Sequence, residues 1–284
     1  MLIKEKILCK LARFTRQHHA MHLDGLLRKV HNPDKRQQTW IERIIMVDHG
    51  LLFKISTASY LEWQLFFYGG YEHFIARLFE FFVQPGAVVL DIGANVGIHA
   101  LRLGQLVGRT GKVYAFEPHP EIFTRLLANR ALNGLTMVEP LQLAVSDHNG
   151  SCNLQGFKQT ACNQGTSFLL RDGETAVVEA PLYQVTMVRL DDWVADYRLT
   201  RLDFIKVDVE GLDIEVLAGA QQLITQFKPT IIFEYDRSNV MRLRWLTTFL
   251  TGLGYQLYII KHDYLVDYNE SLLRGTSRVL AVAN

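Results

Sequence analysis

The chain has 284 residues, of which 49% are hydrophobic, and its mean hydropathy is +0.05. This composition predicts a globular protein that is one large domain or a domain with an extension, and the net charge of +1 argues against a protein designed overall for nucleic acid. Three cysteines are too few for a disulfide framework or a cysteine-based zinc site, so we expect a reducing, cytoplasmic compartment. No apolar run approaches the roughly 18 residues of a membrane-spanning helix.

The basic residues are concentrated at the N-terminus. Residues 1–43 contain ten Lys or Arg against four Asp or Glu, whereas residues 44–284 contain twenty against twenty-five. Apolar residues spaced by three and four predict an amphipathic helix with a cationic face over residues 2–17, and the interspersed charges exclude a signal-peptide core. We therefore expect residues 1–45 to be a basic, helical extension. It either packs on the main domain, residues 46–284, or contacts a membrane surface or a partner peripherally.

The segment before residue 86 is rich in aromatic residues. Residues 40–46 predict a short helix or strand, and residues 51–55 predict a strand that follows a turn. Aromatic and apolar residues at helical spacing between residues 60 and 82 are typical of core packing. Glu72 is the exception, because it is a carboxylate beside a glycine turn, and we treat it as a candidate ligand-binding residue.

Residues 86–97, GAVVLDIGANVG, predict a buried strand, a glycine turn and a helix. The strand ends at Asp91, and Gly93 and Gly97 let the backbone approach a ligand closely. A dinucleotide fingerprint needs a glycine where Asn95 stands, and an acid ahead of the turn would repel phosphate. The turn therefore favours a cationic, hydroxyl-bearing ligand such as S-adenosylmethionine, with an ordinary tight turn as the alternative.

Two further predicted strands also end in polar side chains. Residues 113–116 form a buried strand that ends at Glu117, where an acid commonly binds ribose hydroxyls. A third strand, near residues 141–145, ends in Ser146 and Asp147, which suit an adenine amino group. Acidic tips on successive strands indicate one nucleoside site.

Residues 150–188 interrupt the α/β alternation and predict a β-hairpin insertion on the substrate side. The next strand, DFIKVDV, leads to Asp208 and Glu210, which are functional candidates or else partners in a local ion pair with Lys206. Glu234 lies near the end of the following strand. Strands at 255–260 and 278–282 complete seven strands with a late hairpin.

With these motifs assembled, the chain resembles the FkbM family of methyltransferases. The resemblance rests on VVLDIGANVG at 88–97, AFEPHP at 115–120, LAVSD at 143–147, LDD at 190–192, DFIKVDVEG at 203–211 with Glu215, Gly219 and Ala220, and FE at 233–234. It implies a Rossmann-like class I sheet, S-adenosylmethionine as the cofactor, and methyl transfer to a hydroxyl of a sugar, glycan or natural product. Residues 1–45 lie outside it.

The resemblance also implies residue roles. Cofactor-binding roles fall on Asp91, Gly93, Asn95, Gly97, Glu117, Ser146, Asp147 and Asp208, to which we add Glu72 from its place beside the glycine turn at residues 69–70. Asp208 or Glu210 is the predicted base or acceptor-orienting group, with Glu234 and His119 as second choices. We predict no dedicated metal ligands and leave open a divalent metal at these carboxylates. An inactive nucleoside-binding or scaffolding protein is the alternative, and an NAD-dependent oxidoreductase is less favoured because the middle glycine is missing.

Overall fold

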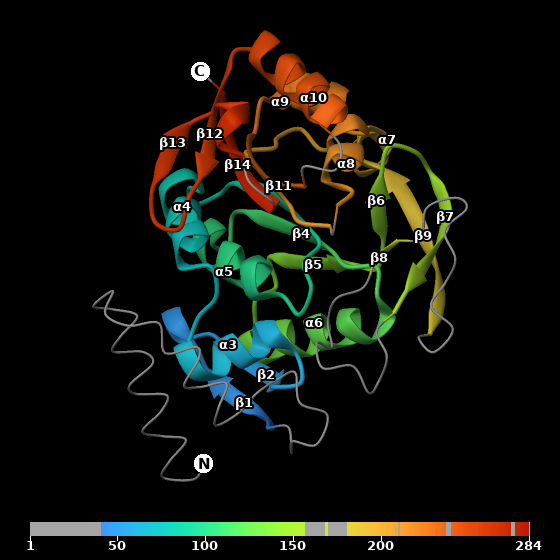
Figure 1. The fold of residues 1–284 in the computed structure, drawn as a ribbon. Coiled ribbons are helices and arrows are strands. Elements are labelled where there is room, and N and C mark those ends of the chain that lie inside the picture. Colours follow the sequence, from blue (N-terminus) through green and yellow to red (C-terminus); the bar gives the residue numbers. More distant parts are fainter. Residues whose placement is uncertain are drawn as a thin grey trace.

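The computed structural model describes residues 41–156, 168–169, 181–209, 211–236, 240–273 and 276–283. The expected N-terminal helix, Glu210 and most of the turn of the predicted insertion lie outside these ranges. Within them, a mixed eight-stranded sheet forms the centre of the molecule, and helices cover both of its faces (Figure 1). None of the described helices is long and apolar enough to span a bilayer.

The main sheet has the strand order β13-β12-β14-β11-β10-β3-β4-β5. Its strands are β3 (Val88–Ile92), β4 (Lys112–Phe116), β5 (Val138–Leu141), β10 (Phe204–Val207), β11 (Thr230–Asp236), β12 (Tyr255–Ile260), β13 (Leu265–Asp267) and β14 (Thr276–Ala283). Neighbouring strands from β5 to β11 are parallel, whereas β14 is antiparallel to both β11 and β12. The predicted α/β sheet with a late hairpin is confirmed, and β13 is an additional short edge strand.

Alternating side chains of the strands divide the core between the two faces of the sheet. Val89 and Phe204 pack on the face covered by α4 (His73–Phe82), α5 (Ile98–Val107) and α6 (Pro120–Asn133). Leu90 and Ile205 pack on the opposite face, covered by α7 (Leu190–Tyr197), α8 (Asp213–Ala218), α9 (Gln221–Phe227) and α10 (Val240–Gly252). Because side chains alternate along a strand, Asp91 and Lys206 share the first face.

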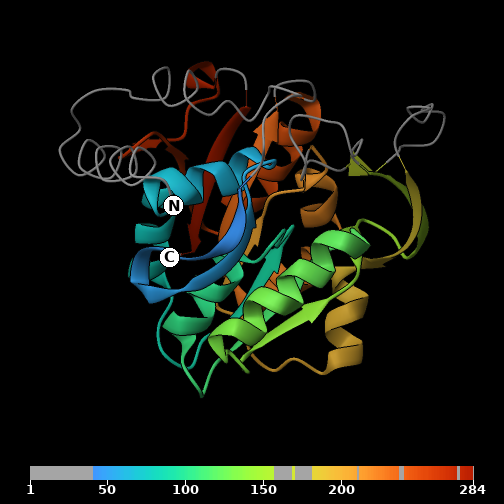
Figure 2. The same cartoon turned by 90° about the horizontal axis from the view of Figure 1, so that it is seen from below.

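A hairpin precedes the main sheet. Its strands β1 (Glu42–Met46) and β2 (Leu52–Ser56) are antiparallel, and α3 (Tyr60–Tyr68) follows. The hairpin lies against α6, as the view from below shows (Figure 2). Asn129 and Asn133 of α6 accept hydrogen bonds from the backbone nitrogens of Lys54 and Leu52, at 2.9 and 2.8 Å. The predicted helix or strand at 40–46 is thus a strand, and it spans the predicted domain boundary at residue 45.

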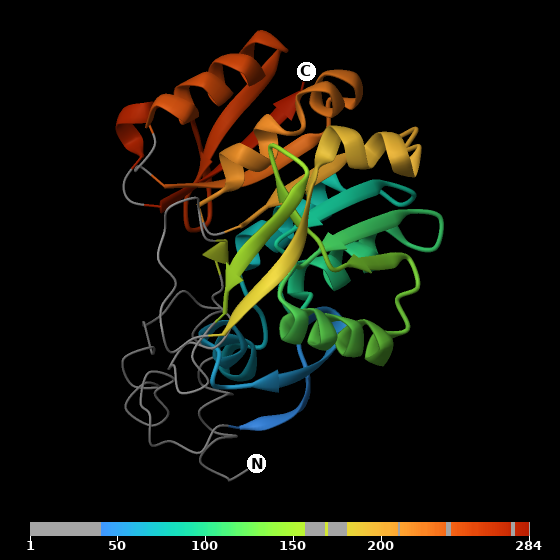
Figure 3. The ribbon, with the colours of Figure 1, turned by 90° about the vertical axis from the view of Figure 1, so that its right-hand side faces the viewer.

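The predicted β-hairpin insertion is confirmed in its described part. Strands β7 (Gly150–Gln155) and β9 (Leu182–Arg189) are antiparallel and join β6 (Ala144–Ser146) and β8 (Phe168–Leu169) in a second sheet (Figure 3). The prediction of one strand near residues 141–145 is wrong. Strand β5 ends at Leu141 in the main sheet. The next strand, β6, belongs to the second sheet and pairs in parallel with β9. Pro140 suits the edge position of β5, because a proline has no backbone N–H to donate to a neighbouring strand. The pairing of β6 with a strand far along the chain leaves no local signal in the sequence.

Candidate active site

A cavity of about 320 Å³ opens at the carboxyl ends of β3, β4, β10 and β11. Ligands of open α/β sheets bind at this edge. Five of the predicted site residues line the cavity, namely Gly93, Asn95, Glu117, Asp208 and Glu234. Tyr71, His99, Lys206 and Arg278 also line it, and Leu154 of β7 brings the insertion to its wall. The structure therefore brings together side chains from segments far apart in the sequence.

The turn after β3 has no room for side chains at its glycines. A β-carbon on Gly93 would lie 1.9 Å from the carbonyl oxygen of Asp208, and one on Gly97 would lie 2.5 Å from Leu126. Both glycines have positive φ, 80° and 96°, which other residues rarely adopt. Asn95 between them is also left-handed, with φ 50°. The turn therefore packs tightly against the end of β10 and against α6, and Gly93 and Asn95 present it to the cavity.

Glu117, at the end of β4, faces this turn. Its carboxylate accepts hydrogen bonds of 2.9 Å from the backbone nitrogens of Asn95 and His119. Burial raises the pKa of Glu117 to about 7, although both hydrogen bonds act to lower it. The carboxyl group is therefore about half ionised near neutral pH and lies where additional hydroxyl donors would favour its charged form.

Asp91 lies beneath the cavity rather than in its lining. It is fully buried, and neither of its carboxylate oxygens accepts a hydrogen bond from a described residue. Its ion-pair partner is Lys206, which is opposite it in the sheet and whose Nζ lies 3.3 Å from Asp91 and 3.5 Å from Asp208. Burial opposes the charge of Lys206, but the carboxylates of Asp91, Asp208 and Glu72 raise its pKa. The local ion pair weighed as an alternative for Asp208 thus exists and extends to Asp91.

A second ionic group joins the loop before α4 to the far strands of the sheet. The Glu72 carboxylate lies 2.5 Å from Nη2 of Arg278 on β14, and the same nitrogen lies 3.2 Å from Glu234. The other Glu72 oxygen lies 2.9 Å from Nε2 of His99. Burial alone would raise the pKa of Glu72, but His99 and then Arg278 lower it to about 2. Glu72 is therefore ionised, and it reaches the cavity through His99 and Arg278.

Asp213, which was not predicted as a site residue, joins the ends of two central strands. Its carboxyl group accepts hydrogen bonds from the backbone nitrogens of Glu234, at 3.0 Å, and Val209, at 3.4 Å. Burial and the nearby charge of Asp208 raise the pKa of Asp213 to about 8. It is therefore largely uncharged at neutral pH and fixes the backbone that carries Asp208 and Glu234.

Besides Glu72, Asp91 and Gly97, three more predicted residues, His119, Ser146 and Asp147, lie outside the cavity lining. His119 is 1% exposed, and its Nδ1 accepts a hydrogen bond from the backbone nitrogen of Ile122 at the start of α6. Burial lowers the pKa of His119, and its ring packs on Tyr183. Ser146 donates to Asp147, and the cavity is lined instead by the residues just before them, Leu143, Ala144 and Val145.

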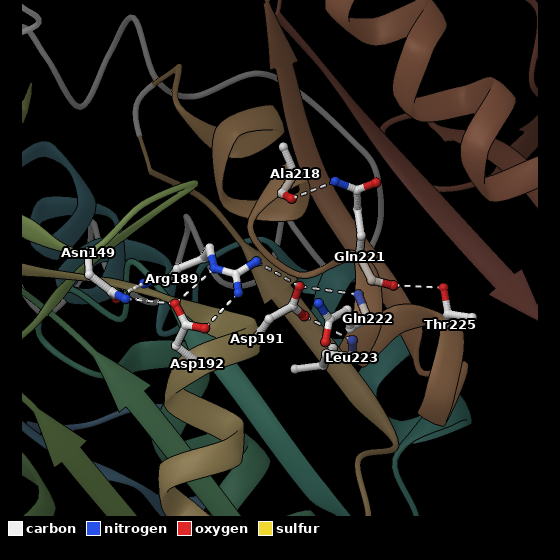
Figure 4. Close-up of polar contacts among 9 residues, drawn as sticks. All are labelled: Asn149, Arg189, Asp191, Asp192, Ala218, Gln221, Gln222, Leu223 and Thr225. Atoms are coloured by element: carbon white, nitrogen blue, oxygen red, sulfur yellow. Dashed lines mark hydrogen bonds and ion pairs between the residues drawn. The ribbon is translucent and has the colours of Figure 1, made fainter.

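The LDD motif forms a polar network away from the cavity (Figure 4). Asp191 accepts hydrogen bonds from the backbone nitrogens of Gln222 and Leu223 in the first turn of α9, at 3.2 and 2.9 Å. Arg189 contacts both carboxylates, with two hydrogen bonds to Asp192 at 2.9 and 2.6 Å. This motif therefore joins α7 to α9 and supports the fold rather than the ligand site.

Among the described residues, no group of three or more His, Cys, Asp or Glu side chains is placed to hold a metal ion. The polar side chains of the cavity instead form ion pairs and hydrogen bonds with one another. Lys206, Arg278 and Asp213 were missed as site residues by the sequence analysis. For Lys206 and Arg278, the signal that could have found them is a charged residue within an otherwise apolar strand; Asp213, the first residue of α8, carries no such signal.

Comparison with known proteins gives the family. Residues 91–257, more than half of the chain, match the family model described as the methyltransferase FkbM domain. The 2-O-methyltransferase NoeI of Sinorhizobium fredii is 30% identical over 152 residues, covering 50% of this chain and 61% of that protein. The hexuronic acid methyltransferase AglP of Haloferax volcanii is 28% identical over 148 residues, covering 52% and 56%. The 31-O-demethyl-FK506 methyltransferase FkbM of Streptomyces tacrolimicus is 29% identical over 161 residues, covering 49% and 61%.

The matches span 56% to 61% of the length of these relatives. The family model includes the glycine turn, the acidic end of β4 and the segment with Lys206 and Asp208, from which side chains line one cavity. The sequence motifs, the family match and the mixed sheet agree. The chain belongs to the FkbM family of S-adenosylmethionine-dependent methyltransferases.

Proposed function

We propose that this chain transfers the methyl group of S-adenosylmethionine to a hydroxyl group of a sugar, glycan or natural product. The observation that carries the proposal is the cavity in which the Gly93–Gly97 turn faces Glu117. The names of the relatives support the acceptor class, since they describe a 2-O-methyltransferase, a hexuronic acid methyltransferase and an O-demethyl-FK506 methyltransferase.

The residues present fit the cofactor. Gly93 lines the cavity without a side chain, and Glu117 offers a carboxylate to the ribose hydroxyls. Four acidic side chains, Asp91, Asp208, Glu72 and Glu234, surround two basic ones, Lys206 and Arg278, which favours a ligand with positive charge. The cofactor, when bound, supplies a methyl group activated by its attachment to a positively charged sulfur. Ser146 and Asp147 remain proposed neighbours of the adenine, next to the apolar lining at Leu143 and Val145.

Asp208 and Glu234 are the carboxylates placed to orient an acceptor hydroxyl. Both line the cavity, and Asp208 is 26% exposed. Holding the acceptor oxygen in line with the reacting carbon would supply much of the rate enhancement for a methyl group that is already activated. Glu210 stays a proposed participant from the sequence. His119 is a poor choice because its ring is buried outside the cavity lining.

Calorimetry of the intact chain with S-adenosylmethionine, its demethylated product and NAD tests the proposal. We expect binding of the first two and none of NAD; binding of NAD alone would support the oxidoreductase alternative. Incubation with labelled S-adenosylmethionine and a fractionated extract of the source should then label a hydroxyl-bearing compound. Cofactor binding without transfer to any fraction would support the inactive binding protein. Full turnover in EDTA would exclude a required, exchangeable divalent metal.

A further inference from the structure

The two carboxylates that we propose to orient the acceptor, Asp208 and Glu234, are both engaged by cations. Lys206 Nζ lies 3.5 Å from Asp208, and Arg278 Nη2 lies 3.2 Å from Glu234. Each carboxylate is held in place by its ion pair, which suits a group that orients a hydroxyl. A separate proton acceptor is therefore expected among the other polar groups of the cavity.

His99 is the side chain with a suitable open nitrogen. It lies in the first turn of α5, directly after the glycine turn, and it lines the cavity. Its Nε2 lies 2.9 Å from Glu72, while its Nδ1 has no hydrogen-bond partner among the described residues. The edge-to-face contact with Phe79, with ring centroids 5.2 Å apart, and the nearby ring of Tyr71 fix the plane of the imidazole. The imidazole is thus oriented through one nitrogen and open at the other.

The partner of His99 is itself held firmly. Glu72 has φ 46° and ψ 54°, a left-handed conformation that residues with a side chain rarely adopt. Its second oxygen pairs with Arg278 at 2.5 Å. Backbone strain that persists beside a ligand cavity is a common property of functional sites. The arrangement is that of a base oriented by a carboxylate, in which the acid selects the tautomer with hydrogen on Nε2.

We propose that His99 is the catalytic base of the methyl transfer, and that Glu72 is its positioning residue. The inference rests on the proposed function. The bond between the acceptor oxygen and the methyl carbon forms as the sulfur–carbon bond breaks, and that bond's electron pair stays on sulfur. The hydroxyl proton passes to Nδ1 of His99. Glu72, hydrogen-bonded at Nε2, stabilises the imidazolium that results.

The charged and titratable groups around His99 come from several elements. Glu72 and Tyr71 precede α4, Arg278 comes from β14, and Lys206 and Asp208 line the same cavity from β10 and its end. Burial, followed by the charges of Glu72 and Asp208, raises the pKa of Tyr71, which keeps it un-ionised near neutral pH. Among these groups, Glu72 is the one in hydrogen-bond contact with the imidazole.

The kinetic test compares His99→Asn and Glu72→Gln with the wild type and with His262→Asn, a control at an exposed histidine outside the cavity lining. Label transfer from saturating S-adenosylmethionine is measured with the extract fraction that the wild type methylates. His99→Asn should lower kcat about 10²–10⁴-fold, the usual contribution of a general base, with the Kd for S-adenosylmethionine changed less than about threefold. The rise of kcat with pH should disappear in His99→Asn and shift to lower pH in Glu72→Gln, because lost negative charge destabilises the imidazolium.

A second measurement needs no acceptor. In protein labelled with ¹⁵N-histidine, the His99 signals, assigned with His99→Asn, should show hydrogen on Nε2 and none on Nδ1 at pH 8. Hydrogen on Nδ1 would overturn the inference, as would a His99→Asn variant that keeps kcat and its pH dependence, or loses only cofactor affinity. A wild-type chain that binds S-adenosylmethionine but labels no fraction would instead refute the proposed function, and this inference with it.

Discussion

The protonation of Glu117 should couple cofactor binding to pH. In the free protein burial raises the pKa of this carboxyl to about 7, so at pH 6 about nine molecules in ten carry its proton. Ribose hydroxyls donating to the carboxylate would favour its charged form and bring the pKa down to about 4.5 or below. Binding at pH 6 should then release about 0.9 proton, and affinity should fall about fivefold from pH 7 to pH 6.

Calorimetry with S-adenosylmethionine in buffers of different ionisation enthalpy measures that proton release directly. Glu117→Gln is the matched variant, because it keeps the shape of the side chain and removes the titration. It should bind more weakly, by roughly 1.5–3 kcal/mol, with no proton release from this site. The raised pKa of Glu117 also makes the stability of the free protein depend on pH, because the folded state holds this proton more tightly than the unfolded state. The wild type should therefore lose stability, relative to Glu117→Gln, as pH rises from about 4.5 through 7. Equal pH dependence of binding in both proteins would refute the assignment of Glu117 to the ribose.

Three further changes test other parts of the structure. Asp191→Ala should lower the free energy of unfolding by about 1–2 kcal/mol, because the first turn of α9 loses its acceptor, and thermal melting should show this with cofactor affinity unchanged. Gly93→Ala should abolish cofactor binding and destabilise more than Gly254→Ala, which has a similar φ but no atom within 4 Å of the added β-carbon; equal effects would contradict the tight packing at Gly93. Removal of residues 1–31 should keep S-adenosylmethionine binding but reduce turnover or salt-sensitive association with anionic vesicles. If the truncated protein instead melts at a lower temperature, and the intact chain does not bind vesicles, the N-terminal segment only packs on the main domain.

Local sequence patterns were sufficient where one segment determines its own structure. The strand, glycine turn and helix at residues 88–107 need only β-branched residues, glycines with positive φ and helical spacing. Glu117 was found because an acid follows a buried strand directly. The division of residues 138–146 between two sheets was not predictable in this way, because β6 is defined by its partner β9, about 40 residues later. Pairing between distant segments leaves little trace in either one.

For the same reason, the sequence predicted the acidic residues of the site but not the basic residues that pair with them. Asp208 and Glu234 were singled out as acids at strand ends, but the charges that balance them come from pairing across the sheet. Lys206 is opposite Asp91 in the parallel pair β10–β3, and Arg278 is opposite Glu234 in the antiparallel pair β11–β14. A sequence gives the residues on each strand, whereas the register that places them opposite one another depends on the packing of the whole sheet.

The same register explains why these charges can be buried in one place. Asp91 and Lys206 form one buried cross-strand pair, and Glu234 and Arg278 form another, half-buried pair nearer the strand ends, so each of these acids lies beside a base. A buried charge without a partner is costly, and removing one member of such a pair typically destabilises a protein by about 3–5 kcal/mol. Glu72 is an additional acid that belongs to neither cross-strand pair. Its carboxylate contacts Arg278 and His99. Its carboxylate is therefore held in part by a histidine that lines the cavity, so the contact that positions the group we propose as the base also anchors the loop before α4.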